Sequence, residues 1–303
     1  FTVCEKEEEK VNIKKPVSVR RKEGKRGSGS YEMDMCNGPL LGKIIMFAVP
    51  LMLSGILQLL FNAADIVVAG RFAGNEALAA VGSTGSLINL LINVFIGLSI
   101  GTNVLVAQYY GAKRDKDVSE TIHTAILTSL ICGTVLIVIG ISLAKIMLIW
   151  MGTPDDVLDQ ATLYMRIYFV GMPVMMLYNF GSAVLRAVGD TRRPLYFLLL
   201  AGAVNVVLNL FFVIVFGMGV AGVAVATVIS QAISAILVLR CLMKSEGCLR
   251  VHWKNLKIHK HKLLRMIRIC VPAGMQGAIF SISNVLIQHS INSFVSLTMA
   301  GNT

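Results

Sequence analysis

Residues 205–231 read NVVLNLFFVIVFGMGVAGVAVATVISQ, and this stretch decides the class of fold. Two apolar runs meet at Gly217, Met218 and Gly219, and neither run contains a Lys, Arg, Asp or Glu. Each run extends outward to about 20 residues, which is the length that a helix needs to cross a bilayer at about 1.5 Å per residue. The stretch therefore predicts two transmembrane helices joined as a tight antiparallel hairpin.

The rest of the chain has the same composition. Of its 303 residues, 55% are hydrophobic and 15% charged, and the mean hydropathy is +0.71. Soluble domains carry about 25% charged residues, so a soluble enzyme is nearly excluded. We expect an all-α polytopic membrane protein, with residues 70–85 as the connection after the first span and with Pro50 and Pro173 as possible kinks. The expected spans are residues 44–69, 86–107, 121–144, 163–184, 195–216, 220–239 and 266–299.

Basic residues alternate between the two sides of these spans. The chain has 28 Lys and Arg against 17 Asp and Glu, a formal charge of +11. The N-terminal segment and the loops after spans two, four and six hold 25 of the 28, and the other side keeps only Arg71, Lys145 and Arg166. The positive-inside rule places the N-terminus in the cytoplasm. We interpret the charge as membrane topology rather than nucleic-acid binding.

The start of the first span is repeated at the start of the seventh with a shift of 222 residues. Paired repeats are typical of transporters, so the chain is expected to hold one six-helix lobe and the first helix of a second, repeated lobe. We then expect a fragment of a protein of roughly 450 to 480 residues with twelve helices. The aligned identities are Leu41 with Leu263, Ile45 with Ile267, Val49 with Val271, Pro50 with Pro272, Gly55 with Gly277 and Asn62 with Asn284.

Four regions follow from this organisation. Residues 1–38 are expected to be a disordered cytoplasmic segment, because they are charged and lack apolar periodicity. Residues 39–242 form the first six-helix lobe, residues 243–264 a basic cytoplasmic inter-lobe loop, and residues 265–303 the incomplete second lobe.

Polar side chains inside the spans are the candidate site. Asp65 is the one carboxylate within an apolar helix, where it costs about 2.5 to 3.5 kcal/mol on insertion scales, so by default it faces a cavity and binds a cation or proton. A position near the outer end of its span, within reach of headgroup water, is the alternative. Gln58 and Asn62 share its helix face at i, i+4, i+7 spacing. Oxygen ligands of this kind suit sodium or a shared proton, although singly each residue more often joins helices. The further candidates are Asn179, Asn205, Asn209, Thr227, Ser230, Gln231 and Ser234.

No catalytic constellation is present in the sequence. The six cysteines are scattered and are interpreted as free thiols. His252, His259 and His261 lie in the basic loop but do not form a credible metal site with Cys248, and His123 is isolated. We expect no enzyme activity, no cofactor and no metal beyond a coupling Na⁺ at Asp65.

Several strings resemble the multidrug and toxic compound extrusion (MATE) transporters. They are AVPLMLSGILQLLFNAADIVVAGRFAGNEALAAVG (residues 48–82), AQYYGAKR (107–114), LRAVGDTRRPL (185–195) and the hairpin quoted above. The resemblance implies a V-shaped protein of two six-helix lobes, monomeric when full length, in a bacterial plasma membrane. It further implies export of small organic cations in exchange for Na⁺ or H⁺.

The same resemblance suggests roles for the polar residues. An acid on the first span matches Asp65, an Asn on the fifth matches Asn205, and further polar ligands fall near Asn179 and Thr227. Family members often have an Asp where this chain has Asn209, so Asp65 is left as the charge carrier. Gln58, Asn62 and Gln231 are expected to line the cavity.

Three alternatives remain open at this point. A flippase of the same superfamily for lipid-linked oligosaccharides would line its cavity with several Arg or Lys to hold pyrophosphate, and the spans lack such a lining. An exporter of an unknown metabolite is a second alternative. A non-transporting membrane scaffold, the third, would not need the Asp65 cluster.

Overall fold

The computed structural model describes residues 40–245, 247–252 and 256–292. Every regular element among these residues is a helix, as the composition predicts. The expected disordered segment 1–38 and the end of the seventh span lie outside the described residues. The elements are α1 (Leu40–Val68), η1 (Ala69–Ala73), α2 (Asn75–Gly111), α3 (Asp115–Trp150), α4 (Asp155–Val170), α5 (Met172–Ala187), α6 (Arg192–Leu210), η2 (Phe211–Val215), α7 (Gly219–Lys244), η3 (Gly247–Leu249) and α8 (Lys260–Asn292).

The helices agree with seven predicted spans. Five are single helices that are long and apolar enough to cross a membrane, and two more arise if each of two bent helix pairs is one span. The first pair, α4 and α5, meets at an angle of 49° beside Pro173, and α8 bends by 42° just after Pro272. α1 has no comparable break at Pro50. Proline removes one backbone hydrogen bond, but neighbouring contacts decide whether the helix bends.

The connection between the first two spans differs from the expectation. Residues 70–85 were expected to form a loop, yet η1 continues α1 to Ala73 and α2 begins at Asn75. Gly74, with φ 94° and ψ 173°, is the only residue between them, and this conformation is open mainly to glycine. Ala77 and Ala80 pack in the core, so small side chains here allow close helix contact rather than mark a loop.

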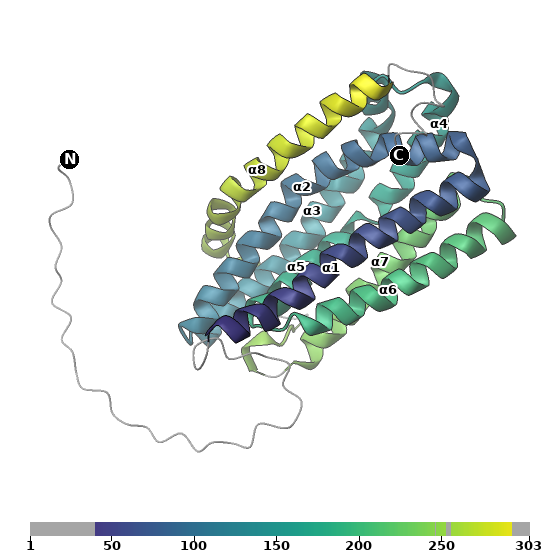
Figure 1. Ribbon diagram of the computed structural model, residues 1–303. Coiled ribbons are helices and arrows are strands. Elements are labelled where there is room, and N and C mark those ends of the chain that lie inside the picture. Colours follow the sequence, from purple (N-terminus) through teal and green to yellow (C-terminus); the bar gives the residue numbers. More distant parts are fainter. Residues whose placement is uncertain (1–39, 246, 253–255, 293–303) are drawn as a thin grey trace, which may run out of the picture. The chain divides into compact units, whose positions relative to one another are not determined.

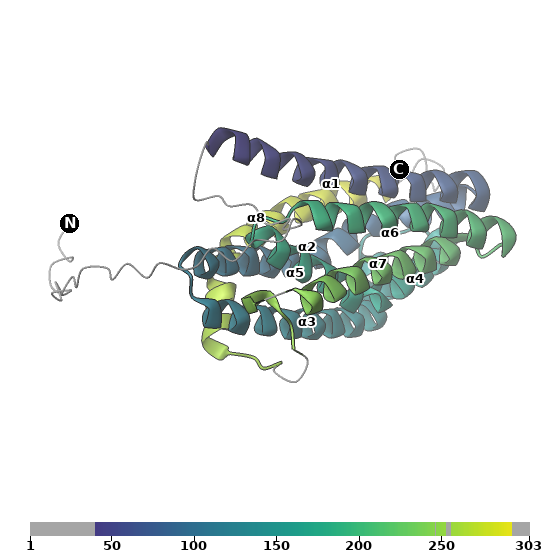
Figure 2. The same ribbon diagram turned by 90° about the horizontal axis from the view of Figure 1, so that it is seen from below.

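The predicted hairpin is confirmed. η2 ends at Val215 and α7 begins at Gly219, with positive φ at Gly217 and Gly219. α6 and α7 lie side by side as a consequence (Figures 1 and 2).

Two helices lie at the margin of the bundle formed by α2, α3, α4, α5 and α7. α1 (purple) runs along α6, and α8 (yellow) runs along α2 (Figures 1 and 2). α8 begins at Lys260, before residue 265, where the second lobe is expected to begin. Its close approach to α2 depends on glycine, since a Cβ at Gly101 would lie 2.5 Å from the carbonyl oxygen of Met266.

Candidate ion-binding site

Four polar side chains from α1, α6 and α7 meet in the interior of the protein. Asn209 of α6 donates hydrogen bonds from Nδ2 to Asp65 Oδ1 and, at 3.2 Å, to Asn205 Oδ1. Thr227 Oγ1 of α7 lies 3.3 Å from Asp65 Oδ2, and Asn205 Nδ2 lies 3.4 Å from Thr227 Oγ1. The structure thus brings together four of the predicted ligands in one hydrogen-bonded network.

The network is buried and carries one carboxylate. Asp65 is 8% exposed, Asn205 4% and Asn209 0%. Among the described residues, the ion pairs involve other carboxylates, so no Lys, Arg or His neutralises Asp65. Asn209 Oδ1 is buried without a hydrogen-bond partner in the described part of the chain. A buried charge and an unsatisfied acceptor both cost free energy, and a small cation or a proton would relieve both.

The backbone around the site explains how the side chains reach one another. Asn205 and Asn209 are one helical turn apart, so both face the same side of α6. Gly202, one turn before Asn205, lets the ring of Phe61 lie against the α6 backbone. α1 and α6 both continue as π-helical segments, η1 and η2, a few residues beyond Asp65 and Asn209. Such segments are frequent at functional sites.

Two other predicted residues lie apart from this network. Asn179 donates to the Met175 carbonyl oxygen in its own helix at 2.9 Å. Gln231 lines a small pocket with Tyr168, Met175 and Thr227, and its Oε1 is buried without a partner in the described chain. Because Thr227 belongs to both, the pocket adjoins the Asp65 network.

Gln58 and Asn62 are exposed on α1, whereas Asp65 is buried. All three lie on one face of α1, and α6 and α7 cover this face at Asp65 but leave Gln58 and Asn62 exposed. Their expected role in lining a cavity stays a prediction, since that cavity would lie against the second lobe.

Sequence reasoning missed two tyrosines. Tyr168 of α4 lines the pocket that Thr227 shares with the Asp65 network, and the centre of its ring lies 6.0 Å from that of Tyr164. Their i, i+4 spacing places both on one face of α4 and was the available signal. Tyr168 places an aromatic surface next to the network.

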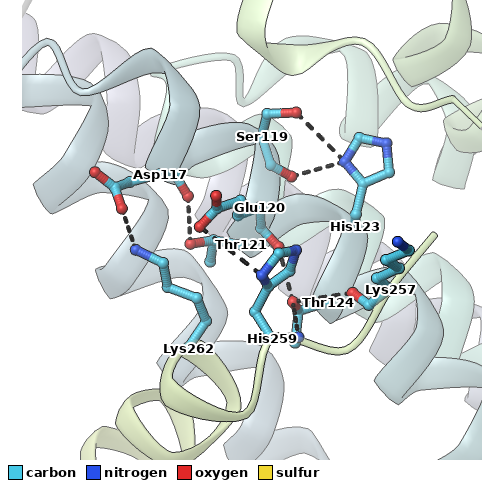
Figure 3. Close-up of polar contacts among 9 residues, drawn as sticks. All are labelled: Asp117, Ser119, Glu120, Thr121, His123, Thr124, Lys257, His259 and Lys262. Atoms are coloured by element: carbon cyan, nitrogen blue, oxygen red, sulfur yellow. Dashed lines mark hydrogen bonds and ion pairs between the residues drawn. The ribbon is translucent and has the colours of Figure 1, made fainter. Parts of the chain in front are cut away.

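A second polar cluster lies at the start of α3, far from Asp65 in the sequence (Figure 3). His123 was expected to be isolated, but its Nε2 accepts a hydrogen bond from the backbone N–H of His252 at 3.1 Å. Side-chain patterns do not predict a contact with a backbone amide. Within the described ranges, no group of three or more His, Cys, Asp or Glu could hold a metal ion.

Comparisons with known proteins show the family. Residues 50–211 match the MatE family. The chain is similar to the probable multidrug resistance proteins YoeA (33% identity over 83% of this chain and 56% of that protein) and YpnP (29%, 88% and 60%), both from Bacillus subtilis. A crystal structure of MATE in the bent conformation has a TM-score of 0.76 at 24% identity, over 82% of this chain and 55% of that one.

This chain belongs to the MATE family of transporters, which are not enzymes. It is a multi-pass protein of the plasma membrane. The chain spans a little over half the length of the relatives that it matches.

Proposed function

We propose that the complete transporter exports small organic cations in exchange for Na⁺ or H⁺, and that the coupling ion binds at Asp65. Two relatives are named as multidrug resistance proteins, which supports drug export. This chain contributes the first lobe and the beginning of the second. Alternating access would use both lobes, so this chain alone is not expected to transport.

The observation that carries the proposal is a buried carboxylate without a cationic partner. Asp65 accepts hydrogen bonds from Asn209 and Thr227 but forms no ion pair within the described structure. Two neutral donors offset only part of the cost of burying the charge. A monovalent cation or a proton restores neutrality, whereas a divalent ion would leave an excess positive charge.

The Asn209 amide can bond either to a protonated Asp65 or to a bound Na⁺. Asn209 Oδ1 has no partner in the described chain, and after a half-turn of the amide it would accept a hydrogen bond from protonated Asp65. Alternatively, the same half-turn would direct Oδ1 toward Asp65 and Asn205, so that several oxygens surround one Na⁺. The ion is thereby linked to α1 and α6 together.

The adjoining pocket is too small to enclose an organic cation, but its lining would form part of a larger binding surface. Tyr168 offers an aromatic face, which attracts cations, and Met175 offers a flexible, polarizable thioether. Bound ion would reduce the negative charge that the substrate meets, because Thr227 connects the pocket to the Asp65 network. Exchange then requires only that the inward and outward states differ in affinity for each ligand.

The test is efflux by the complete transporter in proteoliposomes with Asp65→Asn. Ethidium efflux is measured once with a Na⁺ gradient at equal pH and once with a pH gradient without Na⁺. Efflux by Asp65→Asn should fall to the level of protein-free vesicles, since an amide keeps the shape but not the charge. Asp159→Asn is the matched control, because its side chain is 91% exposed.

The wild type identifies the coupling ion by the gradient that drives efflux. Undiminished efflux by Asp65→Asn would remove Asp65 from the coupling site. A wild type that exports no organic cation under either gradient would overturn the substrate class and favour another transported molecule.

A further inference from the structure

In the connection between α7 and α8, residues 247–252 and 256–259 lie against the first turns of α3 (Figure 3). Leu249 and Val251 bury their side chains, and the Val251 N–H donates to the Leu242 carbonyl oxygen at 3.3 Å. Farther along, the His259 N–H donates to Thr124 Oγ1 at 3.2 Å. These described residues are therefore held by α3 as well as by α7.

Between these contacts, His123 accepts a backbone hydrogen bond. Its Nε2 lies 3.1 Å from the amide nitrogen of His252, and its Nδ1 lies 2.7 Å from the Ser119 carbonyl oxygen. A carbonyl oxygen can only accept, so the proton belongs on Nδ1 and the free lone pair on Nε2. These contacts define a neutral imidazole of one tautomer.

Protonation of His123 would place two donors opposite each other. The cationic ring carries N–H at both nitrogens, so Nε2–H would face the N–H of His252. The side chain is 3% exposed, and water cannot readily separate the two donors. The bond to Ser119 would persist, whereas the bond to His252 would be lost.

Other charged groups surround this contact. Glu120 of α3 pairs with His259 at 4.0 Å, and Lys257 accepts at its carbonyl oxygen from Thr124 at 3.4 Å (Figure 3). The His252 side chain is exposed. Protonation of His259 would strengthen its pair with Glu120, so it cannot account for release at low pH.

A separate anchor holds the start of α8. Lys262 pairs with Asp117 of α3 and lies 4.1 Å from the centre of the Tyr109 ring, and Arg265 Nη1 donates to Tyr109 Oη at 2.9 Å. None of these four side chains is a histidine. The anchor should therefore survive a mild acidification.

We propose that the contact between His123 and the His252 amide is a pH-sensitive clasp, which holds the described part of the α7–α8 connection on α3. With His123 neutral, the His252 amide is bonded to α3; with His123 protonated, that bond is lost while Lys262 still holds α8. The clasp lies on the side that the basic residues assign to the cytoplasm, so cytoplasmic acidification would loosen this connection. This proposal does not depend on which substrate or ion is transported.

Hydrogen exchange in the complete transporter tests the clasp. Protection factors, which correct for the intrinsic pH dependence of exchange, are compared at about pH 8 and about pH 5.5, a range that spans ordinary histidine titration. The wild-type His252 amide should lose about tenfold in protection on acidification, as expected for one lost hydrogen bond. Amides at residues 263–268 should not change.

Three variants isolate His123. His123→Gln retains an acceptor and a donor but does not titrate, so protection should be equal at both pH values. His123→Phe removes the acceptor and should exchange quickly at both. His261→Gln replaces an exposed histidine on α8 and should behave as the wild type.

Two results would overturn the proposal. One is wild-type protection at His252 that does not change with pH; the other is an equal loss of protection in His123→Gln. If a variant does not fold, ¹⁵N-histidine spectra of the wild type decide the matter. A proton on Nε2 of His123 at about pH 8 would contradict the tautomer on which the clasp depends.

Discussion

The contact between Phe61 and Gly202 sets the distance between α1 and α6, and Gly202→Ala tests it. A Cβ built at Gly202 would overlap the Phe61 ring, at separations that real Cβ atoms do not show. Either the ring turns away or α1 moves outward. Overpacking of this kind typically costs about 1–3 kcal/mol of unfolding free energy.

The Asp65 network should be disturbed as well. Phe61 is one turn before Asp65, and Gly202 is one turn before Asn205. The 3.3 Å separation between Thr227 and Asp65 is already near the upper limit for a hydrogen bond. An outward shift of α1 by a few tenths of an ångström would break that bond. Any stabilisation by the ion that we propose at Asp65 should therefore decrease together with basal stability.

The assay is reversible unfolding in mixed micelles of the wild type, Gly202→Ala, Phe61→Ala and the double variant. If overlap is the cause, the double variant should be more stable than the sum of the single effects by about 1–2 kcal/mol. Gly85→Ala is the matched control, because a Cβ there meets nothing within 4 Å. It should be neutral or stabilising, since alanine favours a helix over glycine by up to about 1 kcal/mol.

Additive effects, within about 0.5 kcal/mol, would refute the overlap argument. A Gly202→Ala protein as stable as Gly85→Ala would also refute it.

Two further predictions concern glycines elsewhere. Gly74→Ala should destabilise by about 1–3 kcal/mol, because the conformation at φ 94° and ψ 173° excludes a Cβ, and a neutral result in the same unfolding assay would contradict this. Gly101→Ala should push α8 away from α2, because the obstacle is the backbone oxygen of Met266 at 2.5 Å and cannot rotate aside. Faster hydrogen exchange along α8 is the expected result, and unchanged protection would contradict it.

The membrane spans could be predicted because each is a run of about 20 residues whose apolar character adds up to a clear signal. The hairpin was the clearest case, since Gly217 and Gly219 interrupt two runs that are otherwise uncharged. The loop predicted for residues 70–85 was wrong, because the glycine and serine residues there are typical of loops. In a membrane helix the same small residues permit close packing, as the buried Ala77 and Ala80 show.

The candidate site was predictable in its ligands but not in its surroundings. Asp65 stood out because an intramembrane carboxylate is costly, and the spacing of Asn205 and Asn209 placed both on one face of α6. The proximity of Tyr168 could not be predicted, since it depends on how α4 packs against its neighbours. The role of His123 was missed because its partner is a backbone amide, which every residue except proline carries.

The packing of α1 connects the site to a movement of this helix. Only 6% of the most apolar window of the α1 span is buried, against 33–44% in the other four single-helix spans. Within the described chain, α1 packs mainly along α6, and the Phe61–Gly202 contact and the bonds of Asp65 are among its contacts. Replacing the Asn209 and Thr227 donors by a bound ion would alter the contacts that Asp65 makes with both α6 and α7. Ion occupancy at the proposed site should consequently shift α1 relative to these two helices.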